Sequence, residues 1–401
     1  MIAGMEGPVR PARATEAGGE HVPLLVIGAG PYGLSTAAHA KRHGIDTLLV
    51  GDPMGFWRRH MPEGMLLRSG TDWHLDADGV DTFEAYLSQR GIDPAGVPPV
   101  PLKTFLDYTD WFCAQTDIRP RPTLVTSLDK VDRRFAVGFE GGQRLTADAV
   151  VAAPGLAQFP AIPEWVPASL PERCWSHTSA SVQFAHLRDA RVLIVGGRQS
   201  AYEWAALLAE AGAAALYVVH RHDSPSFQTS HWEFVDELMG NTIRVPGWFR
   251  RLPTAERDTI AQRFWAEGRL KLEPWLTARL PDNVVQRRPG TWVAVCRELS
   301  SGEIEATLST GEDLIVDHVL LATGYKPNLA NIDYLRPLLD RIETTDGFPV
   351  LDEHFQTSVA GLYMPGFLAT RDFGPFFGFV RGCTAAATLI VATLSDVNQL
   401  D

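Results

Sequence analysis

Two strand–turn–helix units that open on glycine constrain this chain more than any other feature. The first joins an apolar run at 24–27 to the turn Gly28-Ala29-Gly30-Pro31-Tyr32-Gly33, an alanine-rich segment and a second apolar run at 47–50. The second spans 191–219 around the turn Gly196-Gly197-Arg198-Gln199-Ser200-Ala201, and Gly196 lies 168 residues after Gly28. A strand, glycine turn, helix and strand within about 30 residues is typical of a dinucleotide-binding unit. Two copies predict an α/β fold with two doubly wound, Rossmann-like domains.

The first turn has a glycine at each position where the motif requires one. Gly28 permits the tight turn, Gly30 lets the backbone approach a pyrophosphate, and Gly33 lets helix and strand pack closely. The amides at the start of the helix then face the phosphates. An acid should follow the next strand to bind a ribose, and Asp52 lies one residue beyond the usual spacing. Asp52 is the expected ribose contact, and a surface turn residue is the alternative.

The second turn departs from the motif. Arg198 occupies the second glycine position and Ala201 the third, where alanine is tolerated. The arginine side chain must turn away from the cofactor or bind a phosphate directly. After the next strand comes His220-Arg221-His222, and Arg221 suits the 2′-phosphate of NADPH. A solvated basic turn is the alternative, and with no third ligand nearby the two histidines predict no metal site.

Composition excludes several classes of partner. The net charge of −12 argues against nucleic acids and anionic membranes, and the chain has no apolar run of the roughly 18 residues that a membrane span needs. The 4 cysteines are far apart and form no CxxC pair, which favours a reducing, cytoplasmic location. At roughly 100–200 residues per domain, the 401 residues predict two or three domains. Residues 1–20 are expected to be a disordered lead, and a homo-oligomer stays open.

Further motifs give the chain a family resemblance. With its two glycine turns, the Ala322-Thr323-Gly324-Tyr325 segment and the tail at 361–382, it resembles the two-dinucleotide flavoprotein monooxygenases. These include the flavin-containing monooxygenases, the Baeyer–Villiger enzymes and the microbial amine N-hydroxylases. The segment from Phe56 to Leu66 is similar to the flavin-contact stretch of the N-hydroxylases. The resemblance implies a glutathione-reductase-like arrangement with FAD on the first turn and NADPH on the second. It also implies oxygenation through a hydroperoxyflavin.

The resemblance also implies which residues contact each cofactor. For FAD they are Gly28, Gly30, Pro31, Tyr32, Gly33, Asp52, Trp57, Met65, Leu66, Thr323, Gly324, Gly366, Asp372 and Gly378. For NADPH they are Gly196, Gly197, Arg198, Gln199, Ser200, Ala201, Arg221 and Tyr325. His177 stands where the monooxygenase fingerprint has its histidine, although Pro171, Arg173 and Ser181 replace the rest of that fingerprint. His177 and Arg198 are the catalytic candidates, and a hydrogen-bonded loop histidine is the alternative for His177.

We therefore expect an FAD domain from residues 21–180 and 316–401, interrupted by an NADPH domain at 181–315 that carries a helical insertion at about 225–290. That insertion is expected either to pack on its domain or to form a lid over a substrate pocket. The expected activity is NADPH- and oxygen-dependent N-hydroxylation of a small amine. Sulfur oxidation, Baeyer–Villiger insertion and decarboxylation stay open. Two other hypotheses are a flavin reductase that passes electrons to a partner and a nucleotide-binding sensor without enzymatic activity.

Overall fold

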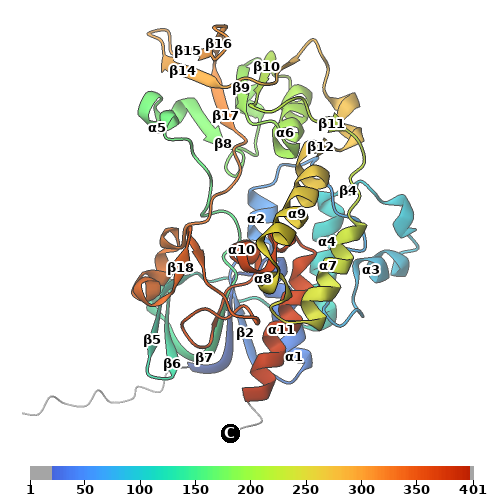
Figure 1. Cartoon of the computed structure of the whole chain (residues 1–401), viewed down its shortest axis with the longest axis vertical. Coiled ribbons are helices and arrows are strands. Elements are labelled where there is room, and N and C mark those ends of the chain that lie inside the picture. Colours follow the sequence, from blue (N-terminus) through green and yellow to red (C-terminus); the bar gives the residue numbers. More distant parts are fainter. Residues whose placement is uncertain (1–19, 398–401) are drawn as a thin grey trace, which may run out of the picture.

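The computed structural model describes residues 20–397. Its lower half in Figure 1, called the first half below, contains a six-stranded sheet in the order β2-β1-β7-β6-β5, with β20 beside β7. Pairing of β1 with β2 and β7, and of β7 with β20, is parallel, whereas β5, β6 and β7 pair antiparallel. The strands are β1 (Glu20–Ile27), β2 (Thr47–Val50), β5 (Val125–Val131), β6 (Arg134–Phe139), β7 (Arg144–Ala152) and β20 (Leu362–Tyr363).

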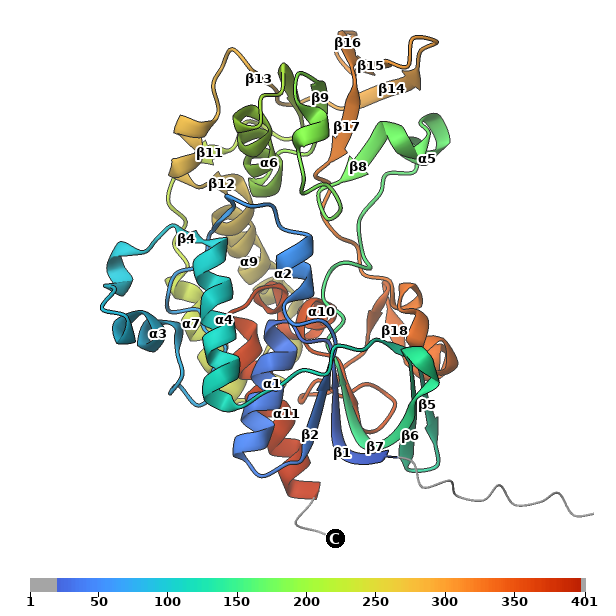
Figure 2. The same cartoon turned by 180° about the vertical axis from the view of Figure 1, so that it is seen from behind.

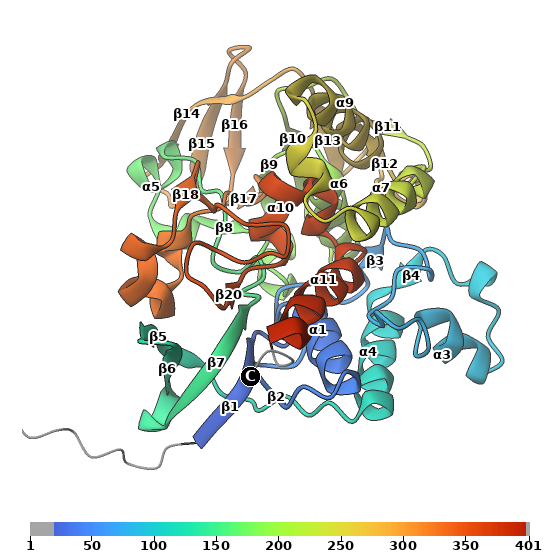
Figure 3. The same cartoon turned by 60° about the horizontal axis from the view of Figure 1, so that its bottom comes forward.

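Helices α1 (Pro31–Arg42) and α11 (Gly382–Val397) lie side by side against this sheet (Figure 3). Leu24, Leu25 and Val26 of β1 are fully buried, as expected of a strand covered on both faces. Pro31 begins α1 because proline has no amide hydrogen to lose at the first helical position. The glycine turn between β1 and α1 thus lies against one strand and two packed helices.

The second half contains a five-stranded, wholly parallel sheet in the order β13-β10-β9-β17-β8. Its strands are β8 (Trp175–His177), β9 (Arg191–Val195), β10 (Ala215–Val219), β13 (Val285–Arg288) and β17 (His318–Leu321), and α6 (Gln199–Glu210) joins β9 to β10. Beside it lies the antiparallel sheet of β14 (Val293–Glu298), β15 (Ile304–Leu308) and β16 (Asp313–Val316). The predicted α/β fold with two Rossmann-like sheets is confirmed.

The second sheet extends beyond the range expected for the second domain. β8 and β17 lie outside 181–315, yet both pair within that sheet. The three residues Trp-Ser-His of β8 carry no apolar run, so their strand has no signal of its own. We therefore propose moving both boundaries outward to include β8 and β17. Of the expected lead at 1–20, residues 1–19 lie outside the described residues, and Glu20 begins β1. The tail at 361–382 contains one short strand, β20, at Leu362–Tyr363.

The insertion does not pack on the second domain alone, since it also packs against the first half. Phe234, Val235, Met239 and Phe264 belong to the apolar core of the first half. In Figure 2, α9 lies between α6 and the lower half. The insertion contains β11 (Ser226–Phe227), α7 (Glu233–Arg244), α8 (Trp248–Arg251), α9 (Thr254–Trp265), the π-helical turn η5 (Ala266–Leu270), β12 (Lys271–Leu272) and the 3₁₀ helix η6 (Pro274–Arg279).

Shorter elements complete the described chain. They are α2 (Gly55–Arg59), β3 (Leu66–Leu67), α3 (Phe83–Gln89), β4 (Val100–Pro101), α4 (Leu102–Thr116), α5 (Trp165–Ser169), β18 (Thr344–Thr345), β19 (Phe348–Pro349) and α10 (Thr370–Phe373), with 3₁₀ turns between them. Across residues 20–397, no helix combines the length and the apolar composition that a membrane crossing needs.

Candidate functional site

The first glycine turn has the shape of a phosphate cradle. A Cβ on Gly28, whose φ is +103°, would lie 2.2 Å from the Ala153 carbonyl oxygen. One on Gly33 would lie 1.8 Å from the carbonyl oxygen of Gly28, whereas one on Gly30 would meet no atom within 4 Å. Two glycines are thus required by packing, and the third borders open space. No side chain caps the start of α1, so its amides are available to a phosphate. These features fit the pyrophosphate of FAD.

Asp52 lies where a ribose contact is expected, at the end of β2 beside β1. Gly51 precedes it, and the Gly51 amide donates to the Arg121 carbonyl at 3.0 Å, which fixes the strand end. The Asp52 carboxylate forms an ion pair with Arg59 of α2, and its side chain is 38% exposed. A bound ribose would share this carboxylate with Arg59.

The segment from α2 to β3 connects the two halves. Trp57 packs on Phe105 at 4.9 Å between ring centres, and Met65 packs against the core of the second half. The Leu66 amide donates to Glu203 of α6 at 3.4 Å. Glu203 is fully buried, and burial raises its pKa although Arg279 lies 3.0 Å away. Trp57, Met65 and Leu66 therefore lie along the junction of the halves.

The C-terminal tail closes over the first turn. The Tyr32 hydroxyl donates to the carbonyls of Phe377 and Phe379 at 2.5 and 2.9 Å. Gly366, with φ +86°, lies against the Tyr32 ring, and Gly378 ends the 3₁₀ turn η10 (Pro375–Gly378). The buried Asp372 carboxylate accepts from the Leu351 amide at 2.8 Å and pairs with Arg371 at 3.2 Å. Asp372 thus joins two loops of the tail, and a ribityl contact for it stays a prediction.

The second glycine turn repeats the first at its base. A Cβ on Gly196, with φ +138°, would lie 2.4 Å from the Ala322 carbonyl oxygen, just as Gly28 meets Ala153. A Cβ on Gly197 would run into the His220 ring. Ala201 is 1% exposed, and Gln199 and Ser200 begin α6. Both turns therefore abut the residue after a neighbouring parallel strand.

Arg198 takes the place of the open glycine, and its side chain extends to the insertion. Its guanidinium lies over the Trp265 ring at the end of α9, 3.8 Å from the ring centre. Burial lowers the pKa of Arg198, and the charge of Arg221 adds to this effect. Arg221 is exposed after β10. The two arginines expected at the second site thus lie close enough for their charges to interact.

The rings of His177, at the end of β8, and Tyr325, shortly after β17, lie in contact; this contact is called the clasp below. His177 Nε2 lies 3.0 Å from the Gly324 carbonyl, and Nδ1 lies 2.8 Å from Ser179 Oγ. Burial lowers the pKa of His177, and it raises the pKa of Tyr325 to about 12. The Thr323 hydroxyl donates to the Ala161 carbonyl. Both nitrogens of His177 already have partners, so its geometry is that of a positioning residue.

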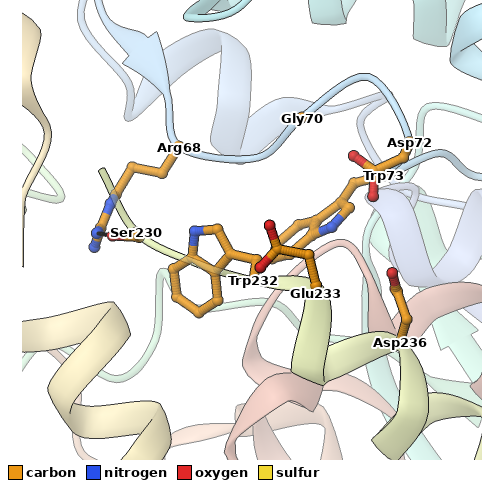
Figure 4. A pocket seen from close by; sticks show the side chains of 8 residues that line it. All are labelled: Arg68, Gly70, Asp72, Trp73, Ser230, Trp232, Glu233 and Asp236. Carbon is orange, nitrogen blue, oxygen red and sulfur yellow. Dashed lines mark hydrogen bonds between the residues drawn. The ribbon is translucent and has the colours of Figure 1, made fainter. Parts of the chain in front are cut away.

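A pocket of about 300 Å³ opens between the segment after β3 and the start of α7 (Figure 4). Sequence reasoning did not assign its residues to a site, because they come from chain segments about 160 residues apart. The lining residues are Arg68, Gly70, Asp72, Trp73, Ser230, Trp232, Glu233 and Asp236. Figure 4 shows three carboxylate side chains, those of Asp72, Glu233 and Asp236, among the residues that line the pocket with Trp73.

Two tryptophans form the floor of this pocket. The Trp73 and Trp232 rings meet edge to face at 5.7 Å, and Phe379 lies 6.4 and 6.1 Å from them. Phe379 is the residue whose carbonyl accepts from Tyr32 of the first turn. Burial raises the pKa of Asp72, and the Asp236 and Glu84 carboxylates raise it further. The pocket is therefore acidic, aromatic and linked to the first turn through one residue.

One group of metal-ligand type occurs among the described residues, near the C-terminal end of α1. His39, His43 and Asp78 place ligand atoms within 4.8 Å of one another. Arg42 already binds the Asp78 carboxylate at 3.0 Å, and His39 Nδ1 lies 3.1 Å from it. A cation there would meet the positive charge of Arg42. His220 and His222, considered above for metal, stack on each other instead.

Comparisons with known proteins agree with this geometry. The model of a family described as pyridine nucleotide-disulphide oxidoreductase matches residues 25–236. An FAD-dependent urate hydroxylase of Xanthomonas campestris is 29% identical over 217 residues, 49% of this chain and 45% of the relative. A ferredoxin–NADP reductase of Salinispora arenicola is 30% identical over 209 residues, 50% of this chain and 55% of the relative. The chain thus spans about half the length of these relatives.

A solved structure shares the whole fold. An ornithine N-hydroxylase from a Kutzneria species superposes with a TM-score of 0.78 at 15% identity, covering 94% of this chain and 100% of that chain. At this identity the likeness shows the fold alone. It confirms the predicted arrangement of two dinucleotide-binding domains.

Proposed function

The chain belongs to the pyridine nucleotide-disulphide oxidoreductase family, and from this premise we propose that it is an NADPH-using, FAD-dependent monooxygenase that hydroxylates the nitrogen of a small amine. Family membership makes it a flavoprotein oxidoreductase that binds FAD and a pyridine nucleotide. The acidic, tryptophan-floored pocket is the observation that carries the finer proposal. The substrate and the oxygenation step go beyond what family membership gives.

The cysteines favour oxygen over a disulfide as the electron acceptor. All four are free thiols, and Cys174, Cys296 and Cys383 are buried. Burial raises the pKa of Cys296 to about 11 and that of Cys383 to about 12, so these thiols stay protonated and unreactive. A disulfide-reducing member of such a family needs a reactive pair of thiols beside its flavin. None of these cysteines lies in either glycine turn.

The pocket favours a cationic amine as substrate. Tryptophan faces attract an ammonium group, and carboxylates at hydrogen-bond range strengthen that attraction. Asp72, Glu233 and Asp236 supply three negative charges. Two arginines offset them in part: Arg381 pairs with Asp236 at 2.5 Å and also acts to lower the pKa of Asp72, and Arg68, which pairs with Glu273, lies over the Trp232 ring. A pocket of this size takes a small ligand. An anionic substrate would meet repulsion at the same place.

The residues of this chain position the reactants. When bound, FAD supplies the redox chemistry, accepting a hydride from NADPH and activating oxygen. Asp72 accepts a hydrogen bond from the ammonium group and takes its proton, so that the nitrogen lone pair becomes available. The raised pKa of Asp72 makes this transfer easier than it would be to an ordinary carboxylate. Trp73 and Trp232 exclude water from the nitrogen, and Phe379 separates the pocket from Tyr32.

The test is amine-dependent NADPH oxidation with mass spectrometry of the product. We expect a panel of primary amines to raise the oxidation rate and to yield hydroxylamines. Asp72→Asn should raise the KM for the amine roughly ten- to a hundredfold because a charge-assisted hydrogen bond is lost. Its KM for NADPH should not change. Asp107→Asn, an exposed carboxylate of α4 paired with Lys103, is the matched control. An unchanged KM in Asp72→Asn would overturn the role of the pocket.

A second candidate function is electron transfer to a protein partner. It is favoured by the similarity to a ferredoxin–NADP reductase over half of the chain. On this account, NADPH oxidation would depend on an electron acceptor and not on an amine. Reduction of ferredoxin or of a dye, with no hydroxylated product from any amine, would support it over the monooxygenase.

A further inference from the structure

The insertion docks directly on the second glycine turn. Trp265, at the end of α9, stacks on the Arg198 guanidinium, and the Glu273 amide donates to Gln199 Oε1 at 3.2 Å. Arg198 and Gln199 are the residues at which α6 begins. The insertion therefore lies against the turn that is expected to bind a dinucleotide diphosphate and forms one side of that site, called the wall below.

The π-helical turn η5 brings another arginine, Arg269, to this wall. Gly268 beside it packs against Trp232 so closely that a Cβ would lie 2.6 Å from that ring. Arg68 donates to the Gly268 carbonyl at 2.6 Å. These contacts fix η5 from both sides and leave the Arg269 side chain half-buried. Single π-helical turns within helices occur often at functional sites.

The charge around Arg269 is not balanced. Arg68 has a carboxylate partner, Glu273, at 2.8 Å. Within residues 20–397, neither Arg198 nor Arg269 forms an ion pair or a side-chain hydrogen bond to another residue. Burial lowers the pKa of Arg269 to about 10, and the charges of Arg198 and Arg68 contribute to this shift. Half-buried like charges without a counter-ion are unfavourable, and a bound anion would remove the repulsion.

We propose that Arg269 is a ligand of the pyridine-nucleotide diphosphate and faces Arg198 across it. The anion lies at the start of α6, where the backbone amides and the helix dipole also favour negative charge. Arg221 lies farther along, after β10, where the 2′-phosphate of NADPH is expected. The insertion is thus part of the nucleotide site as well as of the amine pocket, because Gly268 packs on Trp232. This inference rests on the proposed use of a pyridine nucleotide at the second turn and not on oxygenation.

The test is equilibrium binding of NADP⁺ and NAD⁺ to the FAD-loaded protein by calorimetry, without amine. Arg269→Ala should raise both dissociation constants by the same factor, roughly ten- to a hundredfold, since both ligands carry the diphosphate. Arg269→Lys should recover part of the affinity. Inorganic pyrophosphate should compete with NAD⁺ for the wild type and compete less well for Arg269→Ala.

Arg263→Ala is the matched control. Arg263 lies on α9 about two turns before Arg269, is exposed, and has its guanidinium over the Phe234 ring, so its removal should leave both dissociation constants unchanged. Unchanged binding in Arg269→Ala would overturn the proposal. A loss confined to NADP⁺ would also overturn it, because it would assign Arg269 to the 2′-phosphate. The proposed function is tested separately. It would be wrong if protein that binds NADP⁺ normally, wild type or variant, gave no hydroxylated product.

Discussion

At the scale of single residues, the difference between the two glycine turns that matters most for cofactor access is at the second glycine position of the motif. Gly30 borders open space, and the equivalent residue in the second turn is Arg198. Gly28 and Gly196 have the same role, since each meets the carbonyl of a residue that follows a neighbouring strand. The first turn therefore leaves space for a cofactor beside Gly30. In the second turn, Arg198 and the insertion occupy the corresponding side.

A pair of substitutions separates folding from cofactor binding in the first turn. Gly33→Ala places a Cβ 1.8 Å from the Gly28 carbonyl oxygen, and such overpacking costs about 1–3 kcal/mol. Gly30→Ala adds a methyl group to open space, so the protein should fold normally but bind FAD more weakly. Thermal unfolding and flavin absorbance per mole of protein measure the two effects. Equal loss of thermal stability in both variants would contradict this division.

Arg221 should select NADPH over NADH. Its guanidinium is exposed after β10 and unpaired within the described part of the chain. Arg221→Ala should raise the KM for NADPH far more than the KM for NADH, because only NADPH carries the 2′-phosphate. Steady-state kinetics with both coenzymes gives the two ratios. An equal rise for both coenzymes would refute the assignment.

At the scale of elements, the parallel pair β8 and β17 fixes the clasp at His177. Leu321 of β17 pairs with His177, and Val319 pairs with Trp175. Between them Ser176 Oγ lies 2.8 Å from His318 Nε2, a side-chain link across the two strands. Because β8 is only three residues long, this link and the His177 contacts determine where the chain crosses between the two halves.

This link should make stability depend on pH. Burial lowers the pKa of His318 to about 4 from 6.5, and His186 adds to the shift. The unfolded chain then takes up a proton near pH 6.5 that the folded chain does not. The free energy of unfolding should fall as the pH drops from about 6.5 to about 4, by roughly 3 kcal/mol from this group.

Urea unfolding of wild type and of His318→Gln at pH 7.5 and 4.5 measures this contribution. The variant should lose less stability between the two pH values than the wild type. The exposed His186 supplies a control, since His186→Gln should keep most of the wild-type pH dependence. An identical pH dependence in wild type and His318→Gln would contradict the assignment to His318.

At the scale of the whole molecule, local motifs predicted the framework and could not predict the pocket. Both glycine turns, the helices that follow them and the strands on either side of these helices follow from short-range spacing, and the structure confirms them. The pocket joins Asp72 and Trp73 to Trp232 and Asp236, and only the packing of α7 on the first core brings these together. Likewise, Arg269 of η5 lies in no recognisable sequence motif. The sequence therefore predicts the two cofactor turns but not the surfaces that the insertion covers.

Isotope labelling of the product tests the central claim most directly. The enzyme, loaded with FAD, is supplied with NADPH and a primary amine under ¹⁸O₂ in ordinary water, and the product is weighed by mass spectrometry. Monooxygenation predicts one ¹⁸O atom on the nitrogen of each product molecule, with one NADPH consumed for it. NADPH consumption with peroxide or a reduced acceptor and no ¹⁸O in any amine product would contradict the account.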